Sequence, residues 1–166
     1  MNSKHHKTRT FNYGESFEAI QLSKDLTGLE YLQGMQKGEI PEAPAVSALD
    51  IEISEVTFGK ANFEFIPQDF HYNAVGTVHG GVISTILDTA MGCTLMTTLT
   101  KDLTFTTLEL KVNFIKAVTV KTGKMIAVGK IIHAGRTTAI IEASLIDEVG
   151  KVYAHGTSTC LIMQKR

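Results

Sequence analysis

The stretch YNAVGTVHGGVISTILDTAMG, from Tyr72 to Gly92, decides the fold of this chain. When residues are placed at about 100° per step from Gly80, the apolar side chains fall on one broad arc, as in a buried helix. The arc consists of Val82, Ile83, Ile86, Leu87, Ala90 and Cys93. The other side carries small residues and one carboxylate, Asp88. The stretch therefore predicts a central helix with one face in a core and the other open to the close approach of a second backbone.

Strand-like runs flank this helix on both sides. From Ala48 to Phe65, two such runs separated by Gly-Lys predict a hairpin. After the helix, β-rich runs at 104–118, 123–134, 137–148 and 151–163 are separated by short turns, which predicts an antiparallel meander. The strands are long, about 10 residues against a usual 5 or 6. Long strands curve, so the predicted fold is an α+β domain in which one sheet wraps one helix.

In the first run after the helix, apolar and polar residues alternate. The apolar set is Leu108, Leu110, Val112 and Phe114, and Glu109, Lys111 and Asn113 lie between them. This alternation predicts a strand with one buried face and one wet or shared face.

Three regions follow from this pattern. Residues 1–26 are expected to be a flexible polar tail, residues 27–47 a helical arm, and residues 48–166 the main domain. The arm is expected to begin after a Thr27 cap, and its apolar residues recur at helical spacing at Leu29, Leu32 and Met35.

Composition indicates one globular domain. The 166 residues are 43% hydrophobic and 20% charged, with a net charge of -1, so neither nucleic acid nor an acidic membrane surface is an expected partner. Cys93 and Cys160 form no disulfide framework. The N-terminal residues contain no apolar run of the kind that a secretory signal or a membrane anchor needs, and the expected location is the cytoplasm. Because no acid occurs before Glu15, an organelle transit peptide stays open as a weaker alternative.

The helix start is a candidate site. A helix N-terminus offers free N–H groups, and Gly80 or Gly81 would let a carbonyl oxygen come close to them, as in an oxyanion hole. Asp88 stands eight residues further on, about 12 Å at about 1.5 Å per residue, so it cannot serve the same carbonyl within one chain. An antiparallel helix from a second subunit would bring the two together, giving two identical sites per dimer.

Plainer interpretations of these residues remain open. A lone helical Asp is usually solvated, paired glycines often only form a tight turn, and His79 by itself is more often a structural histidine than a catalytic base. His71, His79 and Asp88 lack any recognised ligand spacing, so no metal is expected.

The motifs resemble a known family. The segments NAVGTVHGGVISTILDTAMG at 73–92 and TLELKVNFIKAV at 107–118, the Gly-Arg turn at 135–136 and AHGTSTCLI at 154–162 are similar to the hotdog-fold acyl-CoA thioesterases of the PaaI-like group. The resemblance covers roughly residues 48–163. It implies a hotdog fold and hydrolysis of acyl-CoA thioesters with an aromatic, aryl-acetyl or medium-chain acyl group. No cofactor is expected, since coenzyme A is part of the substrate.

The family's site residues carry over position by position. They match Asn73, His79, Gly80, Asp88 and Thr107. The resemblance implies that the N–H of Gly80 holds the thioester carbonyl and that Asp88 of the partner subunit acts as nucleophile or general base. Asn73 would orient the water or the carbonyl, and Thr107 would hold the water, although a slip of one position would give Thr106 this role. His79 would support the loop.

A basic segment is the expected docking place for coenzyme A. No acid lies between Glu109 and Glu142, but Lys111, Lys116, Lys121, Lys124, Lys130 and Arg136 do. The phosphates could bind Arg136 beside Gly135, and Lys116, with Gly81 near the thioester. Equally, such lysines can serve only to suppress edge pairing of strands. The acyl group is expected to contact Val75, Met91, Leu95, Leu32 and Met35.

Two other functions stay open at this stage. A hotdog dehydratase or hydratase of 3-hydroxyacyl thioesters shares the fold but uses a His-acid pair, and a non-catalytic acyl-CoA sensor would bind without turnover. The expected assembly is a homodimer with shared active sites, arranged as a dimer of dimers, that is, a homotetramer.

Overall fold

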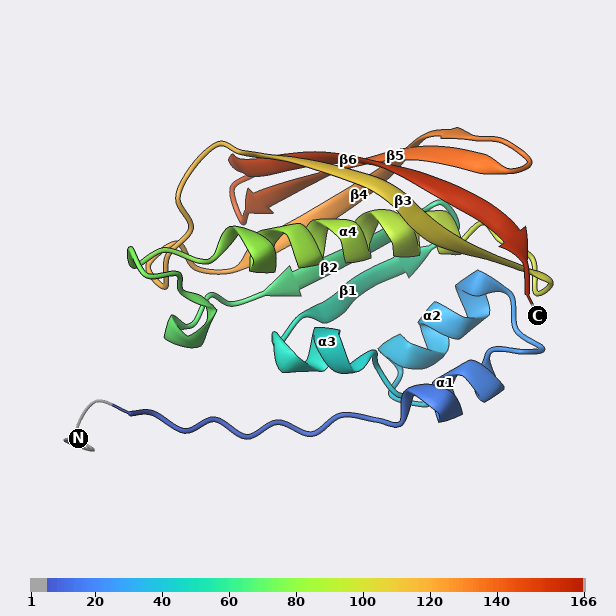
Figure 1. The fold of residues 1–166 in the computed structure, drawn as a ribbon, viewed down its shortest axis with the longest axis horizontal. Helices are drawn as coiled ribbons and strands as arrows, with labels where there is room; N and C mark the ends of the chain where they lie inside the picture. Colours follow the sequence, from blue (N-terminus) through green and yellow to red (C-terminus); the bar gives the residue numbers. More distant parts are fainter. Residues whose placement is uncertain (1–5, 166) are drawn as a thin grey trace.

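One curved antiparallel sheet around one long helix makes up most of the chain (Figure 1). The computed structural model describes residues 6–165. The central helix is α4, Gly80–Met96. The sheet has the order β1-β2-β4-β5-β6-β3, and its strands are β1 Glu52–Thr57, β2 Lys60–Phe65, β3 Leu103–Phe114, β4 Met125–Ala134, β5 Thr138–Asp147 and β6 Val152–Gln164. This architecture confirms the predicted α+β fold. In the described residues, no helix is long and apolar enough to cross a membrane.

Helix α4 packs its apolar face on the concave side of the sheet, as predicted. The fully buried members of the predicted arc are Ile83, Ile86, Leu87 and Ala90. Val82 and Cys93, also placed on that arc, are only half-buried. A buried polar link fixes the helix against β2, because the Thr94 hydroxyl bonds both the N–H and the C=O of Ala61 at 3.2 Å.

The predicted hairpin is present, but it is shorter than its pattern suggested. It consists of β1 and β2, which pair in antiparallel register from Glu52 with Glu64 to Thr57 with Lys60. Gly59 in the connecting turn has φ +78°, a left-handed conformation that favours glycine. Residues 48–51 end a short helix and turn into the strand instead of extending it.

The predicted meander is only partly right. Strands β4, β5 and β6 are joined by hairpins, but β3 pairs with β6 and not with β4. Residues 115–124 form a crossover that brings Val118 into the core, where its carbonyl accepts from the Val78 N–H at 2.9 Å. A hairpin loop usually has two to five residues, and this longer link passes the start of α4 on its way to β4.

The alternation of apolar and polar residues in β3 predicted that its apolar face is buried, but this face is exposed in the single chain. Leu108 and Phe114 are 59% and 56% exposed, and Leu110 is also exposed. Strand β3 is the last strand at one edge of the sheet, so among residues 6–165 no strand neighbours its outer hydrogen-bonding groups. A bulge between Thr107 and Glu109 interrupts its register with β6.

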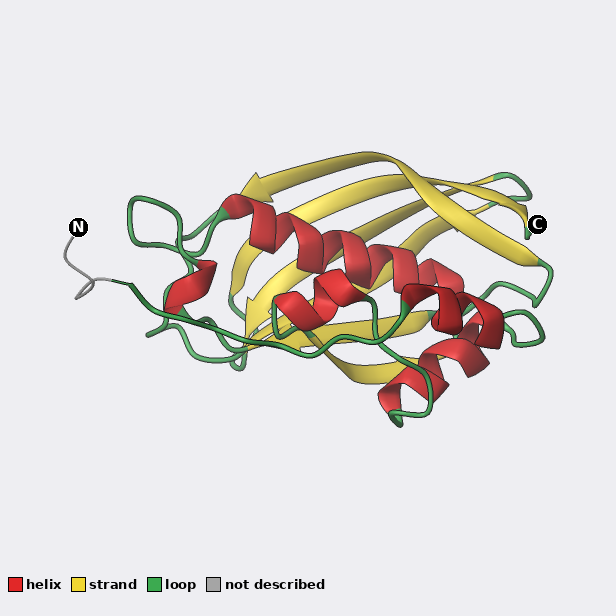
Figure 2. Cartoon of the chain, turned by 60° about the horizontal axis from the view of Figure 1, so that its bottom comes forward, coloured by secondary structure: helices red, strands yellow, loops and turns green. Residues whose placement is uncertain are grey.

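The arm forms as predicted. Helix α2, Gly28–Gln36, begins with a capping box, because the Glu30 N–H donates to the Thr27 hydroxyl at 3.2 Å and the Glu30 carboxylate accepts from the Thr27 N–H at 2.8 Å. A second short helix, α3, Pro44–Ala48, follows. Helix α2 lies beside the C-terminal end of α4 (Figure 2).

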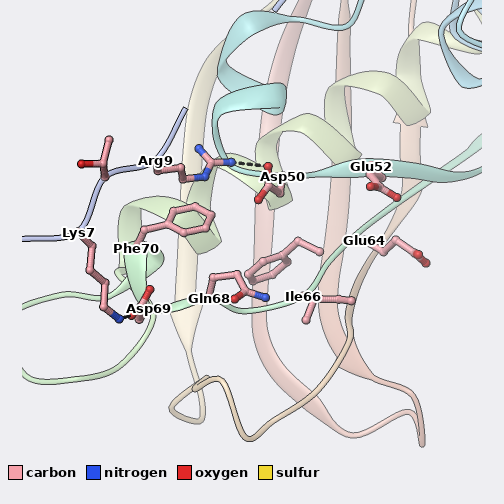
Figure 3. A pocket seen from close by; sticks show the side chains of 11 residues that line it. Lys7, Arg9, Asp50, Glu52, Glu64, Ile66, Gln68, Asp69 and Phe70 are labelled. Carbon is pink, nitrogen blue, oxygen red and sulfur yellow. Dashed lines mark hydrogen bonds and ion pairs between the residues drawn. The ribbon is translucent and has the colours of Figure 1, made fainter. Parts of the chain in front are cut away.

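The region expected to be a tail contains structure. Helix α1 spans Ser16–Leu22, and residues 1–5 of the tail lie outside the described range. Arg9 donates to the Ala48 carbonyl at 2.7 Å, pairs with Asp50, and stacks over the Phe70 ring at 4.0 Å (Figure 3). These contacts border an open groove of about 850 Å³ between the N-terminal segment and the 3-10 helix η2, Asp69–His71. Polar composition predicted a tail, but did not reveal these specific partners.

Acidic conditions are expected to destabilise the fold through His71. This side chain is 1% exposed, its Nδ1 accepts from the Gln68 N–H at 3.0 Å, and its Nε2 donates to the Leu49 carbonyl at 2.9 Å. Burial lowers the pKa of His71, outweighing the Leu49 bond and the Asp50 charge, which raise it. Above a pH of about 6.5 the imidazole is neutral in both the folded and the unfolded chain, so His71 does not reduce the free energy of unfolding. Below that pH, His71 binds a proton in the unfolded chain but stays neutral in the folded chain. The free energy of unfolding therefore falls as the pH decreases, until the pH reaches the pKa of His71 in the folded state.

Urea titrations across this pH range measure the effect. His71→Gln is expected to show a shallower decline between about pH 7 and pH 5, since it removes the linked group. His133→Gln, a change at an exposed histidine, is the control and should keep the wild-type slope. An unchanged slope in His71→Gln would contradict the assignment.

Candidate active site

Asp88 and Thr107 meet on the side of α4 that faces away from the core. Thr107 lies on β3 opposite Cys160, and its hydroxyl donates to Oδ1 of Asp88 at 3.0 Å. The neighbouring Thr106 is exposed, because successive side chains of a strand point to opposite faces. Thr107 is therefore the hydroxyl beside the carboxylate, and within the described part of the chain no hydrogen bond to Oδ2 of Asp88 occurs.

A cavity of about 260 Å³ adjoins this pair. Its walls come from α4, from β1, β2 and β3, and from the arm, and they are mainly apolar. Gly92 makes the close contact of α4 with β3 possible, because a Cβ there would lie 2.7 Å from the Phe105 ring. Asp88 is thus a carboxylate at the side of an apolar chamber.

Two of the five predicted acyl contacts line this chamber. Leu32 and Met35 do so. Met91 and Leu95 do not, since both are fully buried in the core between α4 and the sheet, and Val75 is 84% exposed in the loop before the helix. The helix is apolar on most of its surface, so periodicity did not separate core positions from chamber positions.

The start of α4 lines a second cavity, of about 320 Å³, together with Asn73, Phe114 and Lys116. His79 is the N-cap of the helix, and its Nδ1 accepts from the Gly81 N–H at 2.8 Å. The next two N–H groups bond the His79 carbonyl. Among the residues described, no acceptor is bonded to the Gly80 N–H. One half-buried N–H therefore stays available at the positive end of the helix.

Asn73 shapes the loop that leads to this helix start. Its Oδ1 accepts from the N–H groups of Val75 and Thr77 at 3.0 and 3.2 Å, and its Nδ2 donates to the Thr77 hydroxyl at 2.9 Å. Gly76 in the same loop has φ +83°. These bonds give Asn73 a loop-forming role, which the expectation of a water- or carbonyl-orienting amide did not include.

The two halves of the predicted site are separate within one chain. Asn73 and Gly80 line the cavity at the helix start, whereas Asp88 and Thr107 line the chamber further along α4. The spacing of eight residues corresponds to about 12 Å along the helix axis. Neither half alone has both a carbonyl-binding N–H and a carboxylate.

The predicted coenzyme A residues are also divided. Arg136 and Gly135 lie in the turn between β4 and β5, with Arg136 exposed. Lys116 follows β3 at the opposite end of the sheet, beside the Gly80 cavity. The Gly81 N–H is occupied by His79, which argues against it as a ligand donor. Among the six basic residues, Lys124 pairs with Glu64 and Lys130 with Glu142, each at 3.1 Å.

Sequence reasoning missed three residues around these cavities. Lys151 lies close to Lys116, and partial desolvation together with the Lys151 charge lowers the pKa of Lys116. Tyr31 and Glu42 of the arm line the chamber, and burial raises the pKa of both. No local signal marks these positions, because they depend on how the arm and the last strand pack.

Cys93 in the chamber is a weaker candidate nucleophile than Asp88. Burial, with a contribution from the Asp88 charge, raises the pKa of its thiol to about 12. The thiolate is the reactive form of cysteine, so at neutral pH the carboxylate is the better candidate. No group of three metal-ligating side chains occurs in the described part of the chain.

Replacement of His79 tests its capping contact. His79→Ala is expected to lower the free energy of unfolding by about 1 kcal/mol, because the Gly81 N–H loses its acceptor. His79→Asn can restore a capping oxygen and should recover most of that loss in urea unfolding. Equal destabilisation by both variants would show that the cap is not what His79 contributes.

Several known proteins are similar to this chain in sequence or in fold. The thioesterase superfamily matches residues 75–154. A protein of Saccharolobus solfataricus described as a candidate esterase is 25% identical over 118 residues, covering 71% of this chain and 82% of its own. The structure of a phenylacetic acid degradation-related protein from Ralstonia eutropha JMP134, described as a candidate thioesterase, is 25% identical with a TM-score of 0.70, covering 78% of this chain and 97% of that chain.

Two further solved structures share the fold. The PaaI protein of Escherichia coli is 17% identical with a TM-score of 0.70, covering 83% of this chain and 96% of that chain. A Streptococcus mutans protein solved with acetyl CoA is 24% identical with a TM-score of 0.63, covering 70% of this chain and 90% of that chain.

Fold and site define the class as a hotdog protein with a carboxylate beside an apolar chamber. Within this class, the chain is similar to the thioesterase superfamily over residues 75–154 and resembles its PaaI-like group, and it is a thioester hydrolase.

Proposed function

We propose that this enzyme hydrolyses acyl-CoA thioesters with an aromatic, aryl-acetyl or medium-chain acyl group, releasing the free acid and coenzyme A. The observation that carries the proposal is the Asp88–Thr107 pair at 3.0 Å beside an apolar chamber. A chamber of this kind suits an acyl tail, and the carboxylate at its side suits the thioester carbon. The Streptococcus mutans relative, solved with acetyl CoA, supports coenzyme A as the carrier.

The complete site is proposed to form between two subunits. Two antiparallel α4 helices would place Gly80 of one subunit near Asp88 of the other, which joins the two halves that one chain keeps apart. The exposed apolar residues of β3 support such a pairing, since an edge strand with Leu108 and Phe114 uncovered is suited to contact with a second copy.

The chemistry then follows from the two halves. The free Gly80 N–H donates to the thioester oxygen and stabilises the negative charge that develops there. Asp88 either takes a proton from water as the water oxygen attacks the carbonyl carbon, or attacks that carbon itself. In both routes the carbon–sulfur bond breaks and the sulfur leaves as the coenzyme A thiolate. In the second route the product of this step is an Asp88–acyl anhydride, which water then hydrolyses to the free acid, restoring the Asp88 carboxylate. Thr107 holds Oδ1 of Asp88, which leaves Oδ2 to face the water or the substrate.

The basic residues at the two ends of the sheet are consistent with the proposed antiparallel dimer. Lys116 and Lys151 lie near the Gly80 end, and Arg136 lies at the opposite end of the sheet, where Thr107 is. In an antiparallel dimer, Lys116 of one subunit and Arg136 of the other would flank the same site. Coenzyme A phosphates are proposed to bind between them. A tetramer built from two such dimers remains the proposed assembly.

Thiol release measures the activity directly. The enzyme is incubated with coenzyme A thioesters from acetyl through phenylacetyl, benzoyl and octanoyl to palmitoyl, and the free thiol is detected with a disulfide dye. The expected result is turnover that is fastest for phenylacetyl or octanoyl. With a 3-hydroxyacyl and a 2-enoyl thioester added to the panel, loss or addition of water without thiol release would identify the dehydratase alternative, and tight binding without any reaction would identify the sensor.

A further inference from the structure

The arm supplies one wall of the chamber beside Asp88. Tyr31, Leu32 and Met35 of α2, with Glu42 and Val46 further along, face the chamber, while Asp88 lines it from α4. Helix α2 lies alongside the C-terminal end of α4 in Figure 2. The chamber is therefore bounded by a segment outside the strands and helix that form the fold.

The arm is seated firmly against α4. The Gly28 N–H donates to the Leu99 carbonyl at 3.1 Å, and a Cβ on Gly28 would lie 1.9 Å from the Met96 carbonyl oxygen, so the two backbones are in direct contact. Leu32 is 1% exposed. The capping box at Thr27 fixes the start of α2. A wall held by such contacts has a defined position and can act as a steric limit.

The size of the chamber is restrictive. Its volume of about 260 Å³ corresponds to the liquid volume of roughly nine water molecules, at about 30 Å³ each. Pockets for drug-sized ligands span about 300–1,000 Å³. A phenylacetyl or octanoyl group has the matching number of heavy atoms, and a palmitoyl chain has many more.

We propose that the arm, chiefly through Met35, sets the upper size of the acyl group that this enzyme accepts. The inference rests on the proposed function, because it takes the chamber beside Asp88 as the acyl pocket. Met35 is the informative position, since it lines the chamber and is only half-buried. Leu32 is fully buried, so shortening it would also remove core packing.

The test compares two opposite changes at Met35. Met35→Ala enlarges the chamber and is expected to raise kcat/KM for dodecanoyl-CoA relative to octanoyl-CoA by about tenfold or more, in line with the discrimination that single methylene groups provide in apolar pockets. Met35→Trp fills the chamber and should shift the optimum to shorter acyl groups. Met163→Ala, at an exposed methionine on β6 outside the chamber, is the matched control and should keep the wild-type profile.

Binding of non-hydrolysable thioether analogues, measured in parallel by calorimetry across the same chain lengths, separates the two proposals. Turnover by the wild type with identical length profiles in both Met35 variants would overturn the role of the arm and leave the thioesterase function standing. Absence of turnover, combined with a maximum acyl length for binding that differs between the two Met35 variants, would overturn the proposed hydrolysis and support the role of the arm. Absence of both turnover and binding would overturn both.

Discussion

Asp88→Ala is expected to reduce kcat for thioester hydrolysis by on the order of 10²- to 10⁴-fold, the range that a positioned acid or base contributes. The variant removes the carboxylate that Thr107 holds at 3.0 Å beside the chamber, and burial raises the pKa of the neighbouring Cys93 thiol, which keeps the thiol protonated at neutral pH. The best thioester of the wild-type panel is the substrate, and thiol release is the readout. Substrate binding should be largely retained, because the apolar walls are unchanged.

Three further variants show whether the loss is chemical. Asp88→Asn keeps the shape and should be nearly as inactive as Asp88→Ala, whereas Thr107→Val should lose less, because it removes only the hydrogen bond that orients the carboxylate. Glu148→Ala, at an exposed acid in the β5–β6 turn, should behave as the wild type. Activity of Asp88→Asn within a few-fold of the wild type, with a normal urea midpoint, would remove Asp88 from the mechanism.

Local patterns in the sequence predicted the elements of this fold well. The capping box at Thr27 and the apolar periodicity of α4 involve neighbours along the chain, so their physics can be read directly from residue order. The pairing of β3 with β6 joins strands separated by two others in sequence. No turn signal specifies such a contact, and the short-turn pattern suggested a meander that included β3.

In the candidate site too, some residues were predicted from the sequence, whereas those that depend on long-range packing were not. Resemblance identified Asp88 and Thr107, and the structure brings them together. The chamber wall formed by Tyr31 and Glu42 escaped prediction, because it depends on the seating of the arm against α4. Met91 was assigned to the acyl pocket, although it packs in the core. A helix with apolar residues on most sides does not indicate by periodicity alone which of them face a cavity.

Mixing two inactive variants is expected to restore activity if each site needs both subunits. Asp88→Ala lacks the carboxylate, and Asn73→Ala lacks the bonds to Val75 and Thr77 that hold the loop before Gly80. In a mixed dimer, one site combines both defects and the other has neither. Random exchange of equal amounts makes half of the dimers mixed, so thiol release should recover to about one quarter of the wild-type rate.

The two-subunit site can be separated from a site within one chain by this experiment. If Gly80 and Asp88 of the same chain acted together, every subunit would carry one defect and mixing would restore nothing. Subunit exchange is verified by co-purification of differently tagged variants, and Glu148→Ala mixed with wild type controls for the effect of exchange itself. Confirmed exchange without recovery would place the carbonyl donor elsewhere in the chain that holds Asp88. About 12 Å of helix separates that carboxylate from the free Gly80 N–H, so a donor from a different element would then be required.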